Sequence, residues 1–195
     1  SPPRRRRFPD RRMSHQNKDG DLIPAWVNGS LQPADKIAVH MLGQRHKAVS
    51  VFLTAGPMTL IQRRALGKYH TPGLWANACC THPRWQESPE NCARRRLREE
   101  LGLTDARPEF VGQVEYRADV GNGMVEHELV DVFRAEIRPD CFLRPDPGEV
   151  MDLAWVRLAD LIAAIGRDGD RFTPWLRIYL ADHFRTIFAT DAPLT

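Results

Sequence analysis

The sequence predicts an α/β fold in which helices cover a mixed β-sheet in layers. Runs of β-branched and apolar residues, such as 47–54 and 149–158, have the composition of strands. Amphipathic patterns that begin with helix-starting residues lie at 88–102 and 173–189. The order is hairpin, helix, hairpin, strand and two helices, which favours one layered domain. A chain of 195 residues is long enough to bury the core of such a domain.

The chain begins with a basic arm and a polar segment. Residues 1–12 hold six Arg and one Asp, a local charge of +5, so the net charge of +3 leaves 3 − 5 = −2 for the rest. Because the arm precedes Met13, we expect an added or disordered extension. Residues 13–35 are polar and interrupted by Gly and Pro, which predicts a flexible lead-in. A single domain would then occupy 36–195.

The first predicted hairpin lies near the start of this domain. Residues 47–54 are rich in β-branched side chains, and 58–64 form a second strand pattern after turn residues at 55–57. An irregular loop is expected over 65–76. Residues 77–82 should be a short extended segment.

A helix follows, and its ends are marked in the sequence. Ser88 is a typical N-cap, Pro89 suits the first helical position, and Gly102 is a typical C-cap. Further elements are expected beyond it. These are strands at 109–118, 124–137 and 149–158, a short helix at 159–166, and a C-terminal helix at 173–189.

Composition restricts the setting in which the protein works. Hydrophobic residues make up 42% and charged residues 27%, as in soluble globular proteins, and no apolar run approaches the roughly 20 residues that a membrane-spanning helix needs. Adjacent cysteines in an extended segment point to opposite faces, so we expect free thiols and a reducing cytoplasm. The four cysteines are Cys79, Cys80, Cys92 and Cys141.

The helix at 88–102 carries a recurrent acidic pattern. The residues that form this pattern are Glu87, Arg95, Leu97, Glu99, Glu100, Gly102 and Leu103. Their spacing resembles that of the Nudix box. Carboxylates on one helix face can gather divalent cations that hold diphosphate oxygens. Two positions depart from the box, because Thr81 replaces a glycine and Arg96 replaces a glutamate. Arg96 removes a ligand and adds a phosphate-binding fork, so we expect diphosphate to be held rather than hydrolysed.

Five segments carry a second resemblance. They are TPGLWANACCTHP (71–83), RRRLREELG (94–102), YRADVGNGMVEHE (116–128), EVMDLAW (149–155) and FTPW (172–175). Through these segments, in this order, residues 36–180 resemble type I isopentenyl-diphosphate isomerases, a Nudix-fold family. The resemblance implies a Nudix-like catalytic domain over 36–195. It also implies interconversion of isopentenyl and dimethylallyl diphosphate.

The resemblance implies two metal sites and a basic diphosphate site. A Mn, Mg or Zn site falls on His40, His46, His82, Glu126 and Glu128. Glu126 and Glu128, two apart on a strand, would share a face. A Mg²⁺ ion is expected at Glu100, the backbone carbonyl of Cys80 and the substrate. The basic residues are Lys36, Arg64, Lys68 and Arg96.

The resemblance also assigns the proton transfers. Glu128, assisted by Tyr116, is expected to protonate C4, and Cys80 to take the proton from C2. Trp175 would offer its π face to the carbocation. The remaining candidates are interpreted as ordinary packing or surface residues. They are Cys79, Cys92, Cys141, His70, His127 and His183.

Two other functions remain open from the sequence. One is a Nudix hydrolase of a nucleoside or other diphosphate. Glu99 and Glu100 favour this alternative, and Arg96 and Cys80 oppose it. The other is a catalytically silent Nudix-fold module that binds RNA, and only the basic arm supports this alternative. We expect an isoprenyl diphosphate substrate, no nucleic-acid or membrane partner, and a monomer or homodimer.

Overall fold

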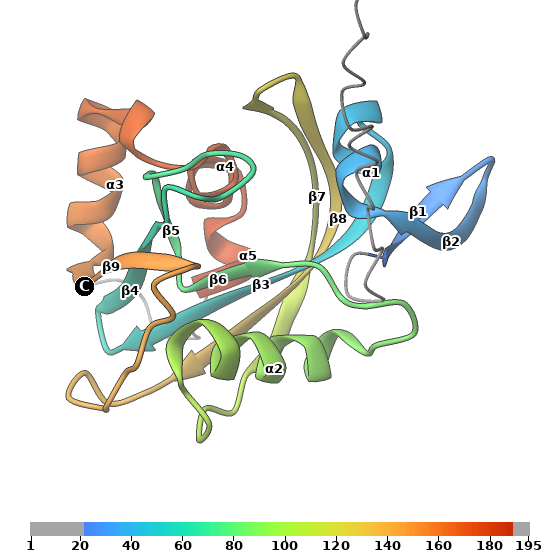
Figure 1. Ribbon diagram of the computed structural model, residues 1–195. Coiled ribbons are helices and arrows are strands. Elements are labelled where there is room, and N and C mark those ends of the chain that lie inside the picture. Colours follow the sequence, from blue (N-terminus) through green and yellow to red (C-terminus); the bar gives the residue numbers. More distant parts are fainter. Residues whose placement is uncertain (1–21, 189–195) are drawn as a thin grey trace, which may run out of the picture.

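The computed structural model describes residues 22–188, in which helices pack on both faces of a mixed β-sheet (Figure 1). The predicted α/β class is therefore confirmed. The basic arm at 1–12 and the first part of the expected lead-in, 13–21, lie outside the described residues. No helix within 22–188 combines the length and the apolar character that crossing a membrane requires.

The described part of the expected lead-in is a regular β-hairpin, so the prediction of a flexible segment is wrong over 22–35. Strands β1 (Leu22–Val27) and β2 (Ser30–Asp35) pair antiparallel. Asn28 and Gly29 connect them with φ values of 50° and 82°. An Asn-Gly pair with both residues at positive φ is the preferred two-residue hairpin turn, because its twist matches that of the strands.

The other strands follow the predicted order. They are β3 (Arg45–Ala55), β4 (Met58–Arg64), β5 (Trp75–Asn77), β6 (Cys79–Thr81), β7 (Glu109–Gly121), β8 (Met124–Glu136) and β9 (Val150–Arg157). β3 lies at the centre and pairs parallel with β8 and antiparallel with β1, β4 and β6. β8 also pairs with β7, and β9 with β4. Both predicted hairpins are confirmed, and the expected loop ends earlier, where β5 begins.

Helix α2 (Pro89–Leu101) begins and ends as its sequence predicts. The Ser88 side chain accepts a hydrogen bond from the Asn91 amide at 3.2 Å. Gly102 follows with φ of 67°. An added Cβ there would lie 2.9 Å from Cβ of Arg144, so both conformation and space require glycine.

Helix α1 (Lys36–Leu42), which the sequence did not predict, carries His40. The Asp35 side chain accepts from the Ala38 amide at 2.8 Å, and Gly43 closes the helix with φ of 60°. These are ordinary capping signals, but the helix is too short to show a periodic pattern. His40 is consequently held on a rigid element.

The C-terminal region is also divided more finely than predicted. After α3 (Leu158–Arg167) and a 3₁₀ turn, the expected helix at 173–189 is two helices, α4 (Pro174–Asp182) and α5 (Phe184–Phe188). The single-helix prediction fails at His183, whose φ of −125° interrupts the helical path. The break allows Ile187, on α5, to be fully buried.

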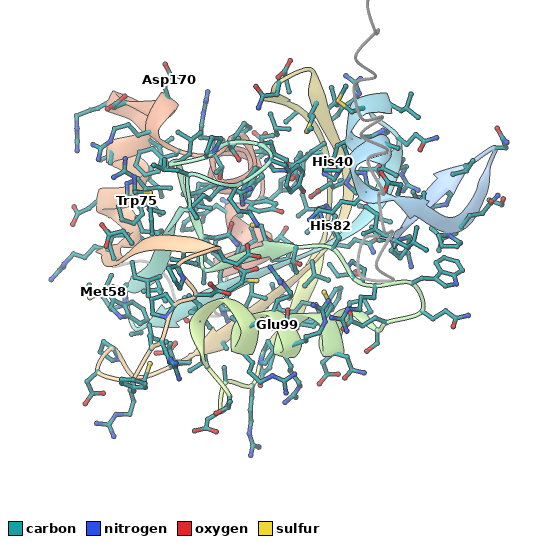
Figure 2. All side chains as sticks on the ribbon, in the orientation of Figure 1. His40, Met58, Trp75, His82, Glu99 and Asp170 are labelled. Carbon is teal, nitrogen blue, oxygen red and sulfur yellow. The ribbon has the colours of Figure 1, made fainter. Side chains whose placement is uncertain are left out.

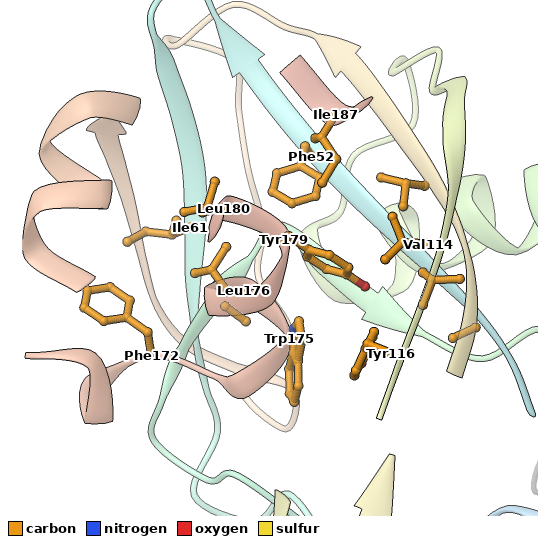
Figure 3. Packing of buried hydrophobic residues seen from close by; sticks show 14 of the residues in the cluster. Phe52, Ile61, Val114, Tyr116, Phe172, Trp175, Leu176, Tyr179, Leu180 and Ile187 are labelled. Atoms are coloured by element: carbon orange, nitrogen blue, oxygen red, sulfur yellow. The ribbon is translucent and has the colours of Figure 1, made fainter. Parts of the chain in front are cut away.

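Two apolar layers lie on opposite faces of the sheet, and β3 contributes to both. Val49, Val51 and Leu53 pack in the layer that contains α2. Phe52, at an alternate position of β3, packs with Trp175 and Tyr179 of α4 in the other layer (Figure 3). This alternation is the normal consequence of strand pleating. It separates Cys79, in the α2 layer, from Cys80, on the α4 side, as predicted, and all four cysteines are free.

Candidate active site

Strand register brings a histidine, a glutamate and a tyrosine together at one end of the sheet. In the parallel pair of β3 and β8, His46 lies beside Glu128. In the antiparallel pair of β7 and β8, Tyr116 lies beside the same glutamate. Glu126, two residues earlier on β8, shares the face of Glu128 as its spacing predicts. Both carboxylates are buried, with 3% and 5% exposure.

Three imidazoles surround these carboxylates. His46 Nε2 and His82 Nε2 lie 3.2 Å and 2.9 Å from Glu128 Oε1. His40 comes from α1, and Figure 2 shows it close to His82. One ligand atom from each of His40, His46, His82 and Glu128 lies within 4.8 Å of the others. Nitrogen and carboxylate oxygen atoms in this arrangement form a suitable donor set for one divalent ion.

In His40 and His46, the hydrogen bond made by Nδ1 fixes the orientation of the ring and leaves Nε2 facing the carboxylates. Nδ1 of His40 lies 2.7 Å from the carbonyl of Lys36, and Nδ1 of His46 lies 2.7 Å from that of Gln44. Carbonyls only accept, so each Nδ1 carries the proton and donates it. When the ring is neutral, the lone pair of Nε2 then faces inward, and buried His40 Nε2 has no hydrogen-bond partner. Metal-binding histidines are oriented in this way, so the residues fit a divalent ion.

Burial and neighbouring groups set the protonation of the cluster. Burial and the neighbouring His46 lower the pKa of His40 to about 4, which keeps His40 a neutral ligand. Burial opposes ionisation of Glu128, but hydrogen bonds from His46 and Tyr116 hold its pKa below the ordinary value. Without an ion, a proton on His46 serves as the countercharge: burial opposes it, but Glu128 raises the pKa of His46.

Tyr116 joins the two carboxylates through its hydroxyl. Its oxygen lies 2.7 Å from Oε2 of Glu126 and 2.8 Å from Oε2 of Glu128. Burial and these two negative charges raise the pKa of Tyr116 well above its ordinary value, so the phenol keeps its proton. One hydroxyl proton can be donated to either carboxylate. Tyr116 is thus placed to pass a proton between them.

A cleft adjoins the cluster, and the predicted basic residues line it. Lys36, Arg64, Lys68 and Arg96 share its wall with Glu126, Glu128 and Cys80. Burial, and then repulsion from Lys68 and Arg96, lower the pKa of Lys36 to about 8. Lys36 also lies over the ring of Tyr69, 4.6 Å from its centroid. Four cations converging on one cleft indicate an anionic ligand.

Acidic residues neutralise part of this basic wall. Glu149 forms ion pairs with Lys68 and with Arg96, the latter at 3.3 Å. Arg96 also pairs with Glu99 at 2.9 Å and with Glu100 at 2.7 Å. The replacement in the Nudix-box pattern therefore places a guanidinium between the box carboxylates and the cleft wall.

Glu100, the expected Mg²⁺ ligand, is buried with both oxygens in use. Oε1 accepts from Arg96, and Oε2 accepts from Gln62 Nε2 at 3.1 Å. Gln62 is fixed in turn by donating to the carbonyl of Ala78 at 2.9 Å. An ion bound by Glu100 would have to displace or share the contact with Arg96.

Cys80 lines the cleft and is held by two neighbours. Its Sγ lies 2.9 Å from Asn77 Oδ1 and 3.2 Å from Ser50 Oγ. Asn77 Nδ2 donates to the carbonyls of Val51 and Cys79, so its oxygen must face the thiol, which donates to it. Burial raises the pKa of Cys80 well above its ordinary value. In the free protein Cys80 is therefore a thiol, not the thiolate that its predicted role as a base requires.

Trp175 closes the same region from α4. It is 1% exposed, and Figure 3 shows it and Tyr116 within one cluster of buried aromatic and aliphatic side chains. The Arg64 guanidinium lies 5.2 Å from the centroid of its ring. Trp175 lines the cleft, so its indole ring borders the space that a ligand would occupy.

Sequence comparison identifies the family to which this arrangement belongs. A protein of Dinoroseobacter shibae named isopentenyl-diphosphate Delta-isomerase is 59% identical over 172 residues, which are 88% of this chain and 98% of that protein. A protein of the same name from Cereibacter sphaeroides is 60% identical over 168 residues, 86% of this chain and 95% of that protein. The chain belongs to the isopentenyl-diphosphate Delta-isomerase family.

The domain of this isopentenyl-diphosphate Delta-isomerase family member is of the Nudix type. Residues 44–176 match the family described as NUDIX domain. The fold also resembles that of a crystal structure from Deinococcus radiodurans, with a TM-score of 0.65 and 16% identity over 86% of this chain and 99% of the other. At that identity the likeness concerns the fold alone.

Most residues predicted for the isomerase site lie around one cleft. These are Lys36, Arg64, Lys68, Cys80, His82, Arg96, Tyr116, Glu126, Glu128 and Trp175. His40 and His46 are fully buried and reach the carboxylates from outside the cleft wall. Glu100 is connected to this group through Arg96.

Several residues of the site were not predicted from the sequence. His70, expected to be an ordinary packing or surface residue, lines the cleft, and its Nε2 lies 3.2 Å from Glu126 Oε1. Tyr69 lines the cleft beside it. Both lie in a loop without periodicity, so their spacing says nothing about where they point. Asn77 and Ser50 showed no signal because contacts across strands depend on the register.

Proposed function

We propose that this cleft binds isopentenyl diphosphate and interconverts it with dimethylallyl diphosphate. The main support is a cleft that combines a buried His and Glu cluster, a thiol and four basic residues. The chain is also about 60% identical to proteins named for this reaction. As a member of this family the chain is an isomerase. The order of the proton transfers and the roles of the individual residues are our proposal.

The reaction itself determines what the site must provide. Moving the double bond adds a proton at C4 and removes one from C2, and no carbonyl activates either carbon. Protonation of the alkene first is the accessible route, and it generates a tertiary carbocation at C3. The site must therefore supply a strong acid, a base, and stabilisation of the cation in a region shielded from water.

Glu128 is the proposed acid. Tyr116 hydrogen-bonds to it at 2.8 Å, so a proton can pass through the hydroxyl from the Glu126 side. Because the contacts around Glu128 stabilise its carboxylate, its conjugate acid is strong, as an unactivated alkene requires. The proton moves from the carboxyl oxygen to C4, and the π electrons form the new C–H bond.

Cys80 is the proposed base for the C2 proton. The sulfur, as thiolate, would take that proton while the C2–H electrons form the double bond between C2 and C3. Burial, Glu128 and Glu126 all raise the pKa of the thiol in the free protein. An ion held by His40, His46, His82, Glu126 and Glu128 would neutralise the two carboxylates, which strengthens Glu128 as an acid and favours the Cys80 thiolate. We infer Mn²⁺, Mg²⁺ or Zn²⁺ for this position.

The remaining residues position the substrate. Lys36, Arg64, Lys68 and Arg96 would bind the diphosphate, together with a Mg²⁺ ion at Glu100 and the backbone carbonyl of Cys80. Trp175 would present its ring to the carbocation. Arg96 would bind the diphosphate without cleaving it. The diphosphate then only anchors the substrate, because the reaction takes place on the carbon chain.

A single labelling experiment tests the function. The protein is incubated with isopentenyl diphosphate, Mg²⁺ and Mn²⁺ in deuterated water, and the products are followed by NMR. We expect dimethylallyl diphosphate with deuterium in the methyl group derived from C4, and no phosphate release. Release of phosphate from diphosphate compounds without deuterium uptake would instead identify a Nudix hydrolase.

The lowered pKa of Lys36 predicts a pH dependence of substrate binding. With a pKa of about 8, Lys36 loses its charge above that pH, and a bound diphosphate would favour the charged form. Binding near pH 8 should therefore take up protons, and KM should rise above pH 8 while kcat changes less. Calorimetric titration in buffers of different ionisation enthalpy measures the uptake. Lys36→Arg, which stays charged, should remove most of the rise in KM, and an unchanged pH profile in that variant would contradict the assignment.

A further inference from the structure

We infer that His70 supplies a fourth imidazole to the divalent ion of the His and Glu cluster. This inference deepens the proposed function and rests on its metal site. The three histidines that the family resemblance assigns there are His40, His46 and His82. His70 lies outside that set, on the loop between β4 and β5. It reaches the cluster from the side of Glu126.

The geometry places His70 within a second group of ligand atoms. One atom from each of His40, His70 and Glu126 lies within 4.8 Å of the others. His40 belongs to this group and also to the group formed with His46, His82 and Glu128. The rings of His40 and His70 are 5.6 Å apart between centroids. Because the two groups share His40, a ligand atom of His70 lies within 4.8 Å of a residue that belongs to both groups.

The nitrogen that faces the cluster has no hydrogen-bond partner. His70 is 2% exposed, and its Nε2 is buried. Nε2 lies 3.2 Å from Glu126 Oε1, but the direction is not that of a hydrogen bond. The only other buried histidine nitrogen in 22–188 with this property is His40 Nε2. An unpartnered buried nitrogen is costly, and a cation between His40, His70 and Glu126 would satisfy both nitrogens.

The other ring nitrogen is fixed as in a metal-binding histidine. Nδ1 lies 3.0 Å from the hydroxyl oxygen of Thr71. When Nδ1 carries the proton and donates to that oxygen, Nε2 presents its lone pair to the cluster. Thr71 has a φ of 45°, a conformation that non-glycine residues seldom adopt. Backbone strain at the residue after His70 is consistent with a loop shaped to aim this ring.

The loop is anchored on all sides of His70. Arg64 donates from Nη2 to the carbonyl of His70 at 3.1 Å. The backbones of Arg64 and Gly73 are joined by a hydrogen bond of 3.0 Å, which closes the base of the loop. Trp175 packs edge-on against the ring, with 5.7 Å between centroids. His70 is thus positioned by packing, which a ligand requires.

The test counts the histidines that bind a paramagnetic ion. The full chain is loaded with Co²⁺, and proton NMR records the strongly shifted imidazole signals, which arise only from histidines bonded to the metal. We expect four sets of signals in the wild-type protein and three in His70→Gln. Co²⁺ affinity, measured by competition with a chelator, should fall at least about tenfold in this variant.

His127→Gln is the matched control. His127 lies between Glu126 and Glu128 in sequence, but its ring faces Glu115 on the other side of the strand. This variant should keep four sets of signals and the wild-type affinity. Three sets in an active wild-type isomerase would overturn the inference and leave the proposed function intact, and this count needs no variant to fold. A wild-type protein that binds no Co²⁺ would overturn the metal site itself.

Discussion

Replacing Glu128 with Gln is expected to lower kcat for isopentenyl diphosphate by about 10²- to 10⁴-fold, the usual contribution of a general acid. The amide keeps the shape of the side chain but cannot donate a proton of comparable acidity. It also removes one charge from the His and Glu cluster, so divalent ions should bind more weakly. Steady-state kinetics at saturating substrate and metal separate the loss in kcat from the loss in metal affinity.

The control for this variant is Glu115→Gln. Glu115 lies on β7, is exposed, and pairs with Arg45 at 2.7 Å, away from the cleft. It should retain wild-type activity, because an exposed pair contributes little. Thermal unfolding confirms that each variant folds. A folded Glu128→Gln enzyme with near wild-type kcat would refute the assignment of Glu128 as the acid.

Cys80→Ala is expected to lower kcat for isomerisation by a similar factor. Protonation at C4 should remain possible. Glu128 and Tyr116 remain in this variant, so the carbocation can form and return to isopentenyl diphosphate. In deuterated water the recovered isopentenyl diphosphate should then carry deuterium at C4, without formation of dimethylallyl diphosphate. NMR of the recovered substrate measures this partial reaction.

Cys141→Ala is the matched control, since Cys141 is a half-buried thiol outside the cleft. It should exchange and isomerise as the wild-type protein does. If Cys80→Ala isomerises at near the wild-type rate, another group takes the C2 proton and the role of Cys80 is wrong. Loss of isomerisation together with loss of exchange at C4 would contradict separate acid and base residues.

Local signals were sufficient to predict most of the fold. Ser88, Pro89 and Gly102 define the ends of α2 because capping is a property of a few adjacent residues. The β3–β4 and β7–β8 hairpins follow from strand composition and turn residues. The β1–β2 hairpin was missed although Asn28-Gly29 signals its turn, because the surrounding polar residues suggested a flexible segment. The break at His183 has no local signal, since it depends on how α5 packs.

The site was predictable only where family resemblance supplied it. The separation of Glu126 from His127 follows from the pleat of a strand, and the structure agrees. No spacing rule connects His40 with His82, which meet only through the fold. His70 could not be found from sequence, since its position depends on the loop conformation around Thr71. Likewise, the thiol state of Cys80 depends on burial.

Cys79 and Cys80 lie on opposite faces of one short strand. The same segment therefore contributes both to the packing of the core and to the chemistry of the cleft. Inserting or deleting one residue in β6 would exchange the two faces. His82, which follows the change, would then point away from Glu128, with which it now makes a 2.9 Å contact. The segment can therefore tolerate conservative substitution far better than any change in its length.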